Sequence, residues 1–213
     1  MAVGCAGYER LQFTYENGPN RGCPKPIVPL TNADGKATIK TAINDMIAYW
    51  ASGTYIPAGL VWGWHVLSPG IPYEEGLGPS DDEYEDTVKA MVLLTDGDNE
   101  VPNLGNHNGS GHSGYSYVTT TDGASTYRLG STPEAAATAL DTKTSTLCTS
   151  VKNDGIRLYT ITFGPATDQD MMEECATLDD DGERLYYHAP TSDDLDEIFT
   201  EIGEDLSEIH LSM

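Results

Sequence analysis

The sequence has little positive charge and no long apolar run. Its 11 lysines and arginines stand against 34 aspartates and glutamates, which gives a formal net charge of −23 over 213 residues. A surface field of that sign repels phosphate backbones and anionic lipid headgroups, so we do not expect nucleic acid as a partner. No apolar run reaches the length of about 18 residues that a membrane span needs, and Met1 is followed by no export signal.

The four cysteines fall into two pairs that are close in sequence. Cys5 and Cys23 lie near the start, and Cys148 and Cys175 lie near the end. Neither pair has the spacing of a zinc site, so the pattern predicts two local disulfides, with four buried thiols as the alternative. Disulfides persist in oxidising compartments. Because the sequence carries no export signal, we expect a fragment whose missing N-terminal part held the signal or a membrane anchor.

Helical and extended patterns alternate along the chain. Residues 1–35 are rich in glycine and proline and predict an irregular lead-in that ends in an edge strand at Ile27–Leu30. Residues 36–213 predict one domain, in which residues 97–131 form an insertion loop too long and polar for an ordinary connection. The periodicities predict helices from 36 to about 50 and at 57–67, 133–153, 171–176 and 192–209, and strands at 88–95, 156–163 and 185–188.

This alternation predicts an α/β fold, a three-layer sandwich with a mostly parallel sheet between helices. Such folds bind ligands at the carboxyl ends of the strands. Residues 88–95 are nearly all apolar, as expected of a central parallel strand covered on both faces, and 156–163 alternates into the next strand. Ser192 is the predicted N-cap of the last helix.

The strongest chemical signal is a carboxylate that directly follows the predicted central strand. Asp96 comes after Thr95, and Gly97 then allows a sharp turn. Hard cations such as Mg²⁺ or Ca²⁺ prefer oxygen ligands in this kind of open position. An ordinary strand-end turn explains the same three residues equally well.

A second segment makes the pattern more specific. Ser52–Pro57 lies between two predicted helices, and together with the turn at Asp96 it resembles the second and third loops of the metal-ion-dependent adhesion site of von Willebrand factor A domains. The resemblance implies that Thr54 and Asp96 help to hold a divalent cation, Mg²⁺ or Ca²⁺, directly or through water. Asp98 is an acidic neighbour to which the resemblance gives no role.

The tryptophan-rich segment Gly53–Pro69 resembles the von Willebrand A-type domain of TadG-like (TadE/G-like) bacterial pilus-assembly proteins. Residues 106–110, 155–163 and 198–207 fit the same group, and the resemblance runs from about Pro24 to the C-terminus. It implies a binding or assembly module and not an enzyme. It also implies a location in the periplasm or at the cell surface, a membrane anchor in the full-length form, and partners among other envelope or pilus proteins.

One departure from the family is important. The first metal loop, Asp-x-Ser-x-Ser, occurs nowhere in the sequence, so the first strand and helix of the domain are expected to be missing. A cation would lose its main carboxylate and two hydroxyl ligands, and its site would be weak. The sheet would have an open slot, so we expect the chain alone to be poorly stable or self-associating, unless Leu11–Tyr15 forms a replacement strand.

Two other functions remain open. One is an acidic, divalent-metal-dependent hydrolase with Asp96, Asp98 and His107 at the strand ends, and the other is a family remnant without activity. His107 and His112 are the only close histidine pair, and a solvated loop explains them better than zinc. Asp179–Asp181 is interpreted as a charged turn because it lacks the ligand spacing of a calcium loop.

Overall fold

The structure of the protein is a computed structural model. The chain divides into two compact units, Met1–Ser52 and Gly53–Met213. The structure describes residues 25–46, 53–101, 112–113, 116–117, 129–165 and 169–212, without the side chains of 112–113, 116–117 and 209–212.

The described part of the first unit is a short helical segment. A 3₁₀ turn, η2 (Ala33–Gly35), leads into the helix α1 (Lys36–Asn44), which is shorter than the predicted helix and has no buried residue. The edge strand expected at Ile27–Leu30 is absent, since these residues have no regular secondary structure. Pro29 lies inside this run and has no N–H to donate to a ladder, which is the physical reason that a strand is disfavoured there.

The second unit is built on a three-stranded parallel sheet. Its strands are β1 (Ala90–Thr95), β4 (Arg157–Phe163) and β5 (Tyr186–Ala189), in the spatial order β1-β4-β5. Leu93 pairs with Thr160 in the register of the first ladder. All three strands were predicted, with boundaries that differ by one or two residues.

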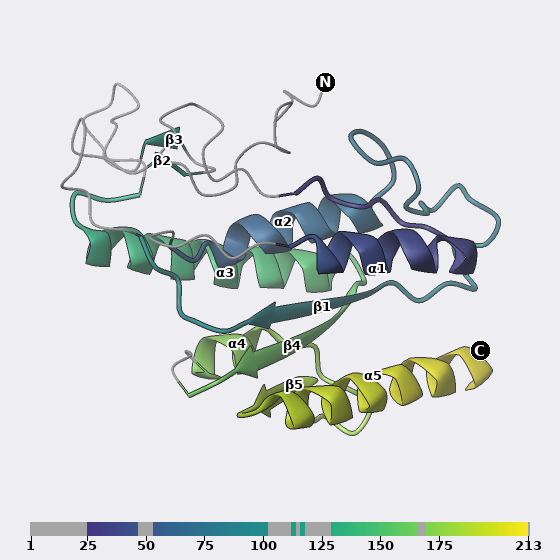
Figure 1. Cartoon of the computed structure of the whole chain (residues 1–213). Helices are drawn as coiled ribbons and strands as arrows, with labels where there is room; N and C mark the ends of the chain where they lie inside the picture. The colour runs from purple at the N-terminus through teal and green to yellow at the C-terminus, as the bar shows by residue number, and fades with distance from the viewer. Residues whose placement is uncertain are drawn as a thin grey trace. The chain divides into compact units, whose positions relative to one another are not determined.

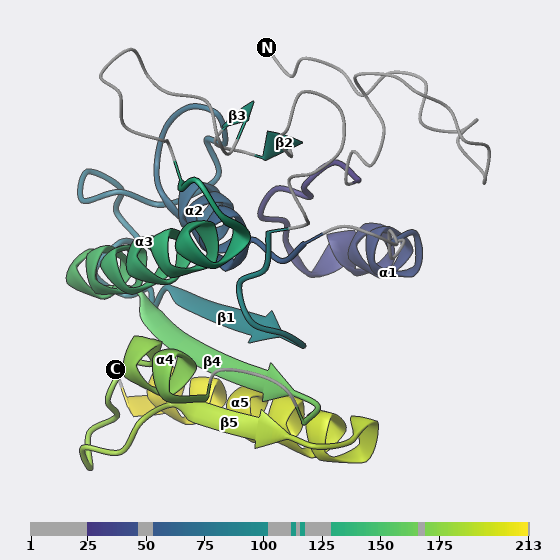
Figure 2. The same cartoon turned by 90° about the vertical axis from the view of Figure 1, so that its left-hand side faces the viewer.

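Helices cover both sides of this sheet and confirm the predicted three-layer α/β fold. The buried side chains of three helices, α2 (Ile56–Leu67), α3 (Pro133–Asn153) and α4 (Gln169–Cys175), pack together on one face. The helix α5 (Ser192–Ser212) packs on the other face through Ile198 and neighbouring apolar residues. Figure 1 shows α2 and α3 on one side of the strands and α5 on the other, and Figure 2 shows the same layers from the side.

A disulfide fastens two helices of the first layer. Cys148 on α3 is bonded to Cys175 on α4, with a Cα–Cα distance of 5.2 Å. This confirms one of the two predicted disulfides. The other predicted pair, Cys5 and Cys23, lies outside the described residues.

The start of α5 differs from the prediction by one residue. Thr191, not Ser192, is the N-cap, because the Thr191 hydroxyl accepts a hydrogen bond from the backbone N–H of Asp194 at 3.4 Å. In return, the Asp194 carboxylate accepts from the Thr191 backbone N–H at 2.9 Å. This reciprocal pair is a capping box, and Ser192 is the first residue inside the helix.

The prediction that β1 is covered on both faces is wrong. Leu93 points into the layer of α2 and α3 and is buried, whereas Val92 and Leu94 on the opposite face are 38% and 41% exposed. Their register partners on β4, Tyr159 and Ile161, are fully buried. The difference arises because α5 packs over β4 and β5, and within Gly53–Met213 no described element covers β1 on that side. On β4, by contrast, five consecutive residues are buried instead of the predicted alternation.

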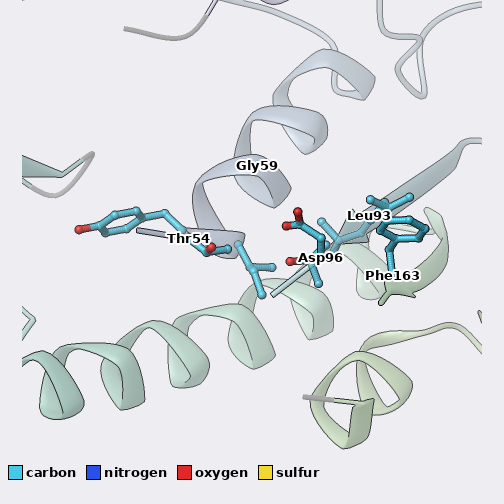
Figure 3. Close-up of a pocket in the computed structure, with 9 residues that line it drawn as sticks. Thr54, Gly59, Leu93, Asp96 and Phe163 are labelled. Carbon is cyan, nitrogen blue, oxygen red and sulfur yellow. The ribbon is translucent and has the colours of Figure 1, made fainter. Parts of the chain in front are cut away.

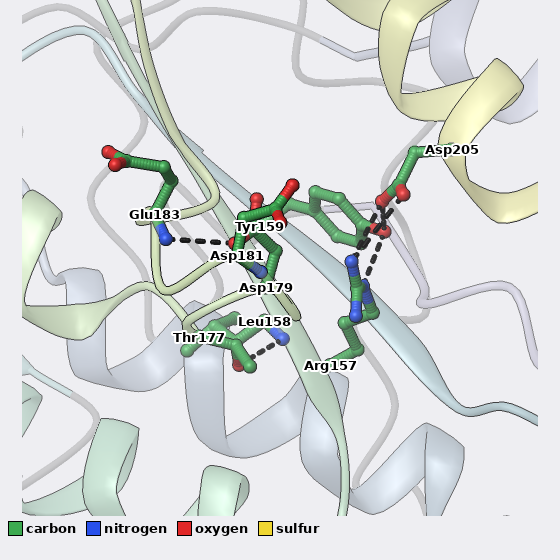
Figure 4. Close-up of polar contacts among 8 residues, drawn as sticks. All are labelled: Arg157, Leu158, Tyr159, Thr177, Asp179, Asp181, Glu183 and Asp205. Carbon is green, nitrogen blue, oxygen red and sulfur yellow. Dashed lines mark hydrogen bonds and ion pairs between the residues drawn. The ribbon is translucent and has the colours of Figure 1, made fainter. Parts of the chain in front are cut away.

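Polar contacts hold the C-terminal half of α5 to β4. The Arg157 guanidinium lies 3.2 Å from the Asp205 carboxylate, and Arg157 Nε donates a hydrogen bond to the Tyr159 hydroxyl at 2.9 Å. The Tyr159 hydroxyl in turn donates to Asp205, as Figure 4 shows. Burial, together with the hydrogen bond to Asp205, raises the pKa of Tyr159 to about 12.

Little of the predicted insertion loop is described. Within residues 97–131, the structure describes the two ends of the segment and two antiparallel strands of two residues each, β2 (His112–Ser113) and β3 (Ser116–Tyr117). Among the described helices, none has the length and apolarity that a membrane crossing requires.

Candidate functional site

The site begins at the carboxyl end of β1, where the chain turns. The hydroxyl of Thr95, the last strand residue, donates a hydrogen bond to the backbone carbonyl of Gly97 at 2.7 Å. This bond closes a tight turn, and Asp96 lies within it with an exposed side chain. The local sequence thus places a carboxylate at the end of an apolar strand, as the sequence predicted.

The second predicted segment lies beside this turn. Thr54 forms a two-bond antiparallel bridge with Glu100, with N–O distances of 2.9 and 3.0 Å. A Cβ built on Gly97 would lie 3.9 Å from Thr54 Oγ1. The bridge therefore brings the two segments together although they are about 40 residues apart in sequence. The metal-binding role of Thr54 and Asp96 stays a prediction.

Asn99 ties three elements together at this place. Its side-chain oxygen accepts a hydrogen bond from the Ile56 backbone N–H at 2.9 Å, and so satisfies one of the unpaired donors at the start of α2. Its amide nitrogen donates to Asp141 at 2.9 Å and to Thr144 at 3.2 Å, both on α3. Asn99 is 5% exposed. Loss of this side chain would leave buried polar groups without partners, so Asn99 positions the loop that carries Asp96.

The sequence analysis missed Asn99, because an asparagine in a polar loop after Asp96 looks like any solvated loop residue. Only its burial and its three partners distinguish it. No pattern in the sequence pairs it with Asp141 or with the start of α2.

An open pocket of about 430 Å³ lies between the start of α2 and the end of β1. Figure 3 shows Asp96 in its centre, with Thr54 on one side and Leu93 and Phe163 on the other. Gly59 lies in the wall formed by α2, and a Cβ added there would meet no atom within 4 Å. Apart from Thr54, Thr95 and Asp96, the described lining is largely apolar: Tyr55, Ile56, Gly59, Leu93, Leu94 and Phe163.

The oxygen ligands among the described residues do not make a complete cation site. Thr54 and Asp96 contribute one hydroxyl and one carboxylate to the pocket lining, whereas a hard divalent cation takes about six oxygen ligands. In the part of the chain that the structure describes, no three or more His, Cys, Asp or Glu side chains gather where they could hold a metal ion. The described residues alone therefore do not fit a tightly bound resident cation.

The other predicted candidates lie apart from this pocket or outside the structure. Of the three residues considered for a hydrolase, the structure describes Asp96 and Asp98, and His107 lies outside the described residues. At the second acidic cluster, the Asp179 carboxylate accepts hydrogen bonds from the backbone N–H groups of Asp181 at 3.0 Å and Glu183 at 2.8 Å (Figure 4). That carboxylate stabilises its own turn, in agreement with the interpretation from the sequence.

Comparisons with known proteins give matches among solved structures. They include two structures of proximal thread matrix protein 1 from the mussel byssus, one of them with a zinc-occupied MIDAS motif. The latter is 18% identical over 82% of this chain and 31% of that chain, with a TM-score of 0.48. The other is 19% identical over 82% of this chain and 32% of that chain, with a TM-score of 0.47. The pilus adhesin SpaC from Lactobacillus rhamnosus GG is 20% identical over 86% of this chain and 22% of that chain, with a TM-score of 0.48.

No family model and no curated protein matches the chain. The chain spans less than a third of the length of each of the three solved structures. Because the three TM-scores lie below 0.5, the α/β fold assigned above rests on the strand order and helix packing of this chain.

Proposed function

We propose that the chain is a protein-binding or assembly module of the von Willebrand A type, in an envelope-associated pilus or adhesion system like that of the TadG-like proteins. It recognises its partner at the carboxyl end of the sheet, and any Mg²⁺ or Ca²⁺ at Thr54 and Asp96 binds weakly. The proposal rests on the sequence resemblance together with one structural observation.

That observation is the junction of the two resembling segments at one pocket. Thr54 and Asp96 come from separate segments, and the Thr54–Glu100 bridge and the buried Asn99 hold those segments together. The pocket beside them is open and largely apolar, which suits a side chain of a protein partner. Asp96 is the carboxylate among its described lining residues, and a pair of acid and base groups for hydrolysis does not occur among them.

The disulfide supports the proposed compartment. A bond between Cys148 and Cys175 persists where thiols are oxidised, as in the periplasm or at the cell surface. The net charge of −23 favours partners with basic surfaces.

The proposed function is tested by measuring binding to pilus and envelope proteins encoded beside its gene. Asp96→Ala should weaken binding of the true partner at least about tenfold, and Gly59→Leu should do the same by filling the pocket. Gly59→Leu also removes a helix-interior glycine, so it should not lower stability. Asp180→Ala removes an equal charge from an exposed turn and serves as the control. Unchanged binding by both pocket variants would contradict the proposal.

The cation is tested separately by calorimetry with Mg²⁺ and Mn²⁺. We expect a dissociation constant weaker than about 10⁻⁴ M, and loss of the signal in Asp96→Ala, because a hard cation needs more oxygen ligands than Thr54 and Asp96 supply. Submicromolar affinity that Asp96→Ala leaves intact would place the metal elsewhere on the chain.

A further inference from the structure

The disulfide lies one helical turn from the polar contacts that hold the loop 96–100, which carries Asp96. Cys148 follows Thr144 by four residues on α3, and the two residues are 1% and 0% exposed. The Thr144 hydroxyl accepts a hydrogen bond from the Asn99 side chain at 3.2 Å. A bond that fixes α3 at Cys148 therefore also fixes a partner of Asn99.

The disulfide connects α3 to a helix that is itself fixed to the sheet. Its other cysteine, Cys175, is the last residue of α4. Within α4, the Met172 carbonyl accepts a hydrogen bond from the buried Thr160 hydroxyl of β4 at 2.7 Å. Directly after α4, the Thr177 hydroxyl accepts from the Leu158 backbone N–H of β4 at 2.9 Å. The disulfide thus links the position of α3 to that of the sheet.

The contacts at Asn99 tolerate little movement of α3. Asn99 is 5% exposed, and its amide nitrogen donates to Asp141 at 2.9 Å and to Thr144 at 3.2 Å. A shift of α3 by about 0.5 Å would take the longer of these two bonds out of the normal hydrogen-bond range. A buried donor without a partner is costly, so the loop 96–100 would loosen when α3 moves.

A noncovalent contact supports the same connection between α3 and α4. Lys152 lies one turn beyond Cys148 on α3. Its ammonium donates to the backbone carbonyls of Glu174 at 2.9 Å and Ala176 at 3.2 Å. These two residues flank Cys175 in the sequence. Because Lys152 holds the same two helices as the disulfide, its contribution should be larger when the disulfide is absent.

We infer that the bond between Cys148 and Cys175 is an oxidation-dependent switch that completes the site at Asp96. In the reduced chain the loop 96–100 is loose, and formation of the bond fixes α3 and with it Asn99. The step is a thiol–disulfide exchange, in which two thiols lose two electrons and two protons to form the S–S bond. The disulfide of an oxidant protein takes them up and becomes a dithiol. The inference rests on the proposed function only in treating the Asp96 loop as the binding site.

Amide hydrogen exchange of the full chain tests the switch without a binding partner. The variant Cys5→Ser/Cys23→Ser keeps only the two cysteines of the disulfide, and it is prepared once oxidised and once reduced. The reporter is the Ile56 amide, which donates to the Asn99 side chain at 2.9 Å. We expect this amide to exchange at least about fivefold faster in the reduced form, the factor that corresponds to one lost hydrogen bond. Equal rates in the two forms would overturn the inference.

A control with a comparable loss of global stability is needed, because removal of a disulfide also favours the unfolded chain. Ile202→Ala, in the oxidised form, truncates a side chain that is 3% exposed and lies under α5, on the opposite face of the sheet. The Thr160 amide, which donates to the Leu185 carbonyl at 3.0 Å, measures the global loss in both proteins. The Ile56 amide of Ile202→Ala should stay within about twofold of the oxidised reference, since α3 is untouched. Equal acceleration at Ile56 in both proteins would mean that this amide reports global unfolding, and the inference would fall.

A bond-free variant separates the tether from the redox state. Cys148→Ala/Cys175→Val removes the bond and fills the space with apolar groups, and its Ile56 amide should exchange as fast as in the reduced form. Addition of Lys152→Met should accelerate it by a further threefold or about that, whereas Lys152→Met in the oxidised chain should change it less than about twofold. Additive effects would contradict a shared hold on α3. A chain that folds in neither bond-free form would show that the bond serves folding as a whole, which also overturns the inference.

Binding measurements distinguish the switch from the proposed function. If a gene-neighbour partner depends on Asp96 but binds the oxidised and the reduced form equally, the proposed function stands and the switch falls. If the Ile56 amide responds to oxidation while no partner depends on Asp96, the switch stands and the proposed function falls.

Discussion

The two lateral halves of the sheet, β1 at one edge and β4 with β5 at the other, differ in how completely helices bury them. The side formed by β4 and β5 is packed between α4 and α5, and Leu158, Tyr159 and Ile161 on it are fully buried. On the side of β1, one face is buried under α2 and α3, while Val92 and Leu94 remain exposed and the outer edge has no described partner strand.

The difference shows that hydrophobicity alone does not decide burial. Val92 and Leu94 are as apolar as their register partners Tyr159 and Ile161, but only the partners have α5 above them. An apolar strand sequence therefore predicts that another element covers the strand, but it does not establish that such an element is there. Stability should accordingly depend on the β4–β5 side, and recognition on the β1 side.

A matched pair of leucine truncations tests this division and should give the largest effect. Leu158→Ala removes a fully buried side chain and should lower the free energy of unfolding by about 3–5 kcal/mol. Leu94→Ala removes one that is 41% exposed and should cost less than about 1 kcal/mol. Urea denaturation of both variants measures the two values. Equal losses would show that β1 is covered in solution.

Removal of the disulfide should have the next largest effect. Cys148 and Cys175 are 27 residues apart, and a loop of that size contributes about 3 kcal/mol by constraining the unfolded chain. We expect Cys148→Ser/Cys175→Ser to lose about that amount, measured by thermal unfolding against the oxidised wild type. Non-reducing peptide mapping provides the control that the bond is present in the wild type. A loss below about 1 kcal/mol would mean that the bond does not constrain the chain.

The sequence predicted the elements whose patterns are local. The helix at 133–153 has a proline at its first position and an apolar stripe, and its bounds agree with α3. The capping of α5 was misplaced by one residue, because Thr191 and Ser192 are both acceptable N-caps and only the carboxylate of Asp194 decides between them. The exposure of Val92 could not be predicted, since it depends on where α5 lies in space.

The residues of the candidate site could likewise be predicted only where they belong to a local sequence pattern. Thr54 and Asp96 were predicted as metal ligands because each lies in a short, recognisable segment next to an apolar element, and that role stays a prediction. The sequence could not supply Asn99, whose partners on α2 and α3 lie more than 40 residues away. The sequence also could not predict that β1 has a described partner strand only in β4, because strand pairing is a property of the assembled sheet.

The polar contacts among Arg157, Tyr159 and Asp205 that hold α5 to β4 should give the smallest effect. This effect is a loss of stability at alkaline pH. The pKa of Tyr159 is raised from about 10 in the unfolded chain to about 12 in the fold, chiefly by burial. The folded protein thus holds this proton more tightly, so its stabilising contribution is complete below pH 10 and is lost as the pH rises from 10 through 12. We expect the free energy of unfolding to fall by about 1–2 kcal/mol over this range from Tyr159 alone, measured by urea denaturation at each pH.

Tyr159→Phe should remove that part of the decline and cost about 1 kcal/mol at neutral pH through the lost hydrogen bonds to Arg157 and Asp205. Tyr187, whose pKa burial also raises to about 12, should maintain a smaller decline in this variant, because its side chain is only partly buried. Tyr159→Phe/Tyr187→Phe should then be nearly flat between pH 10 and 12, and an undiminished decline in the double variant would show that other groups destabilise the fold at alkaline pH.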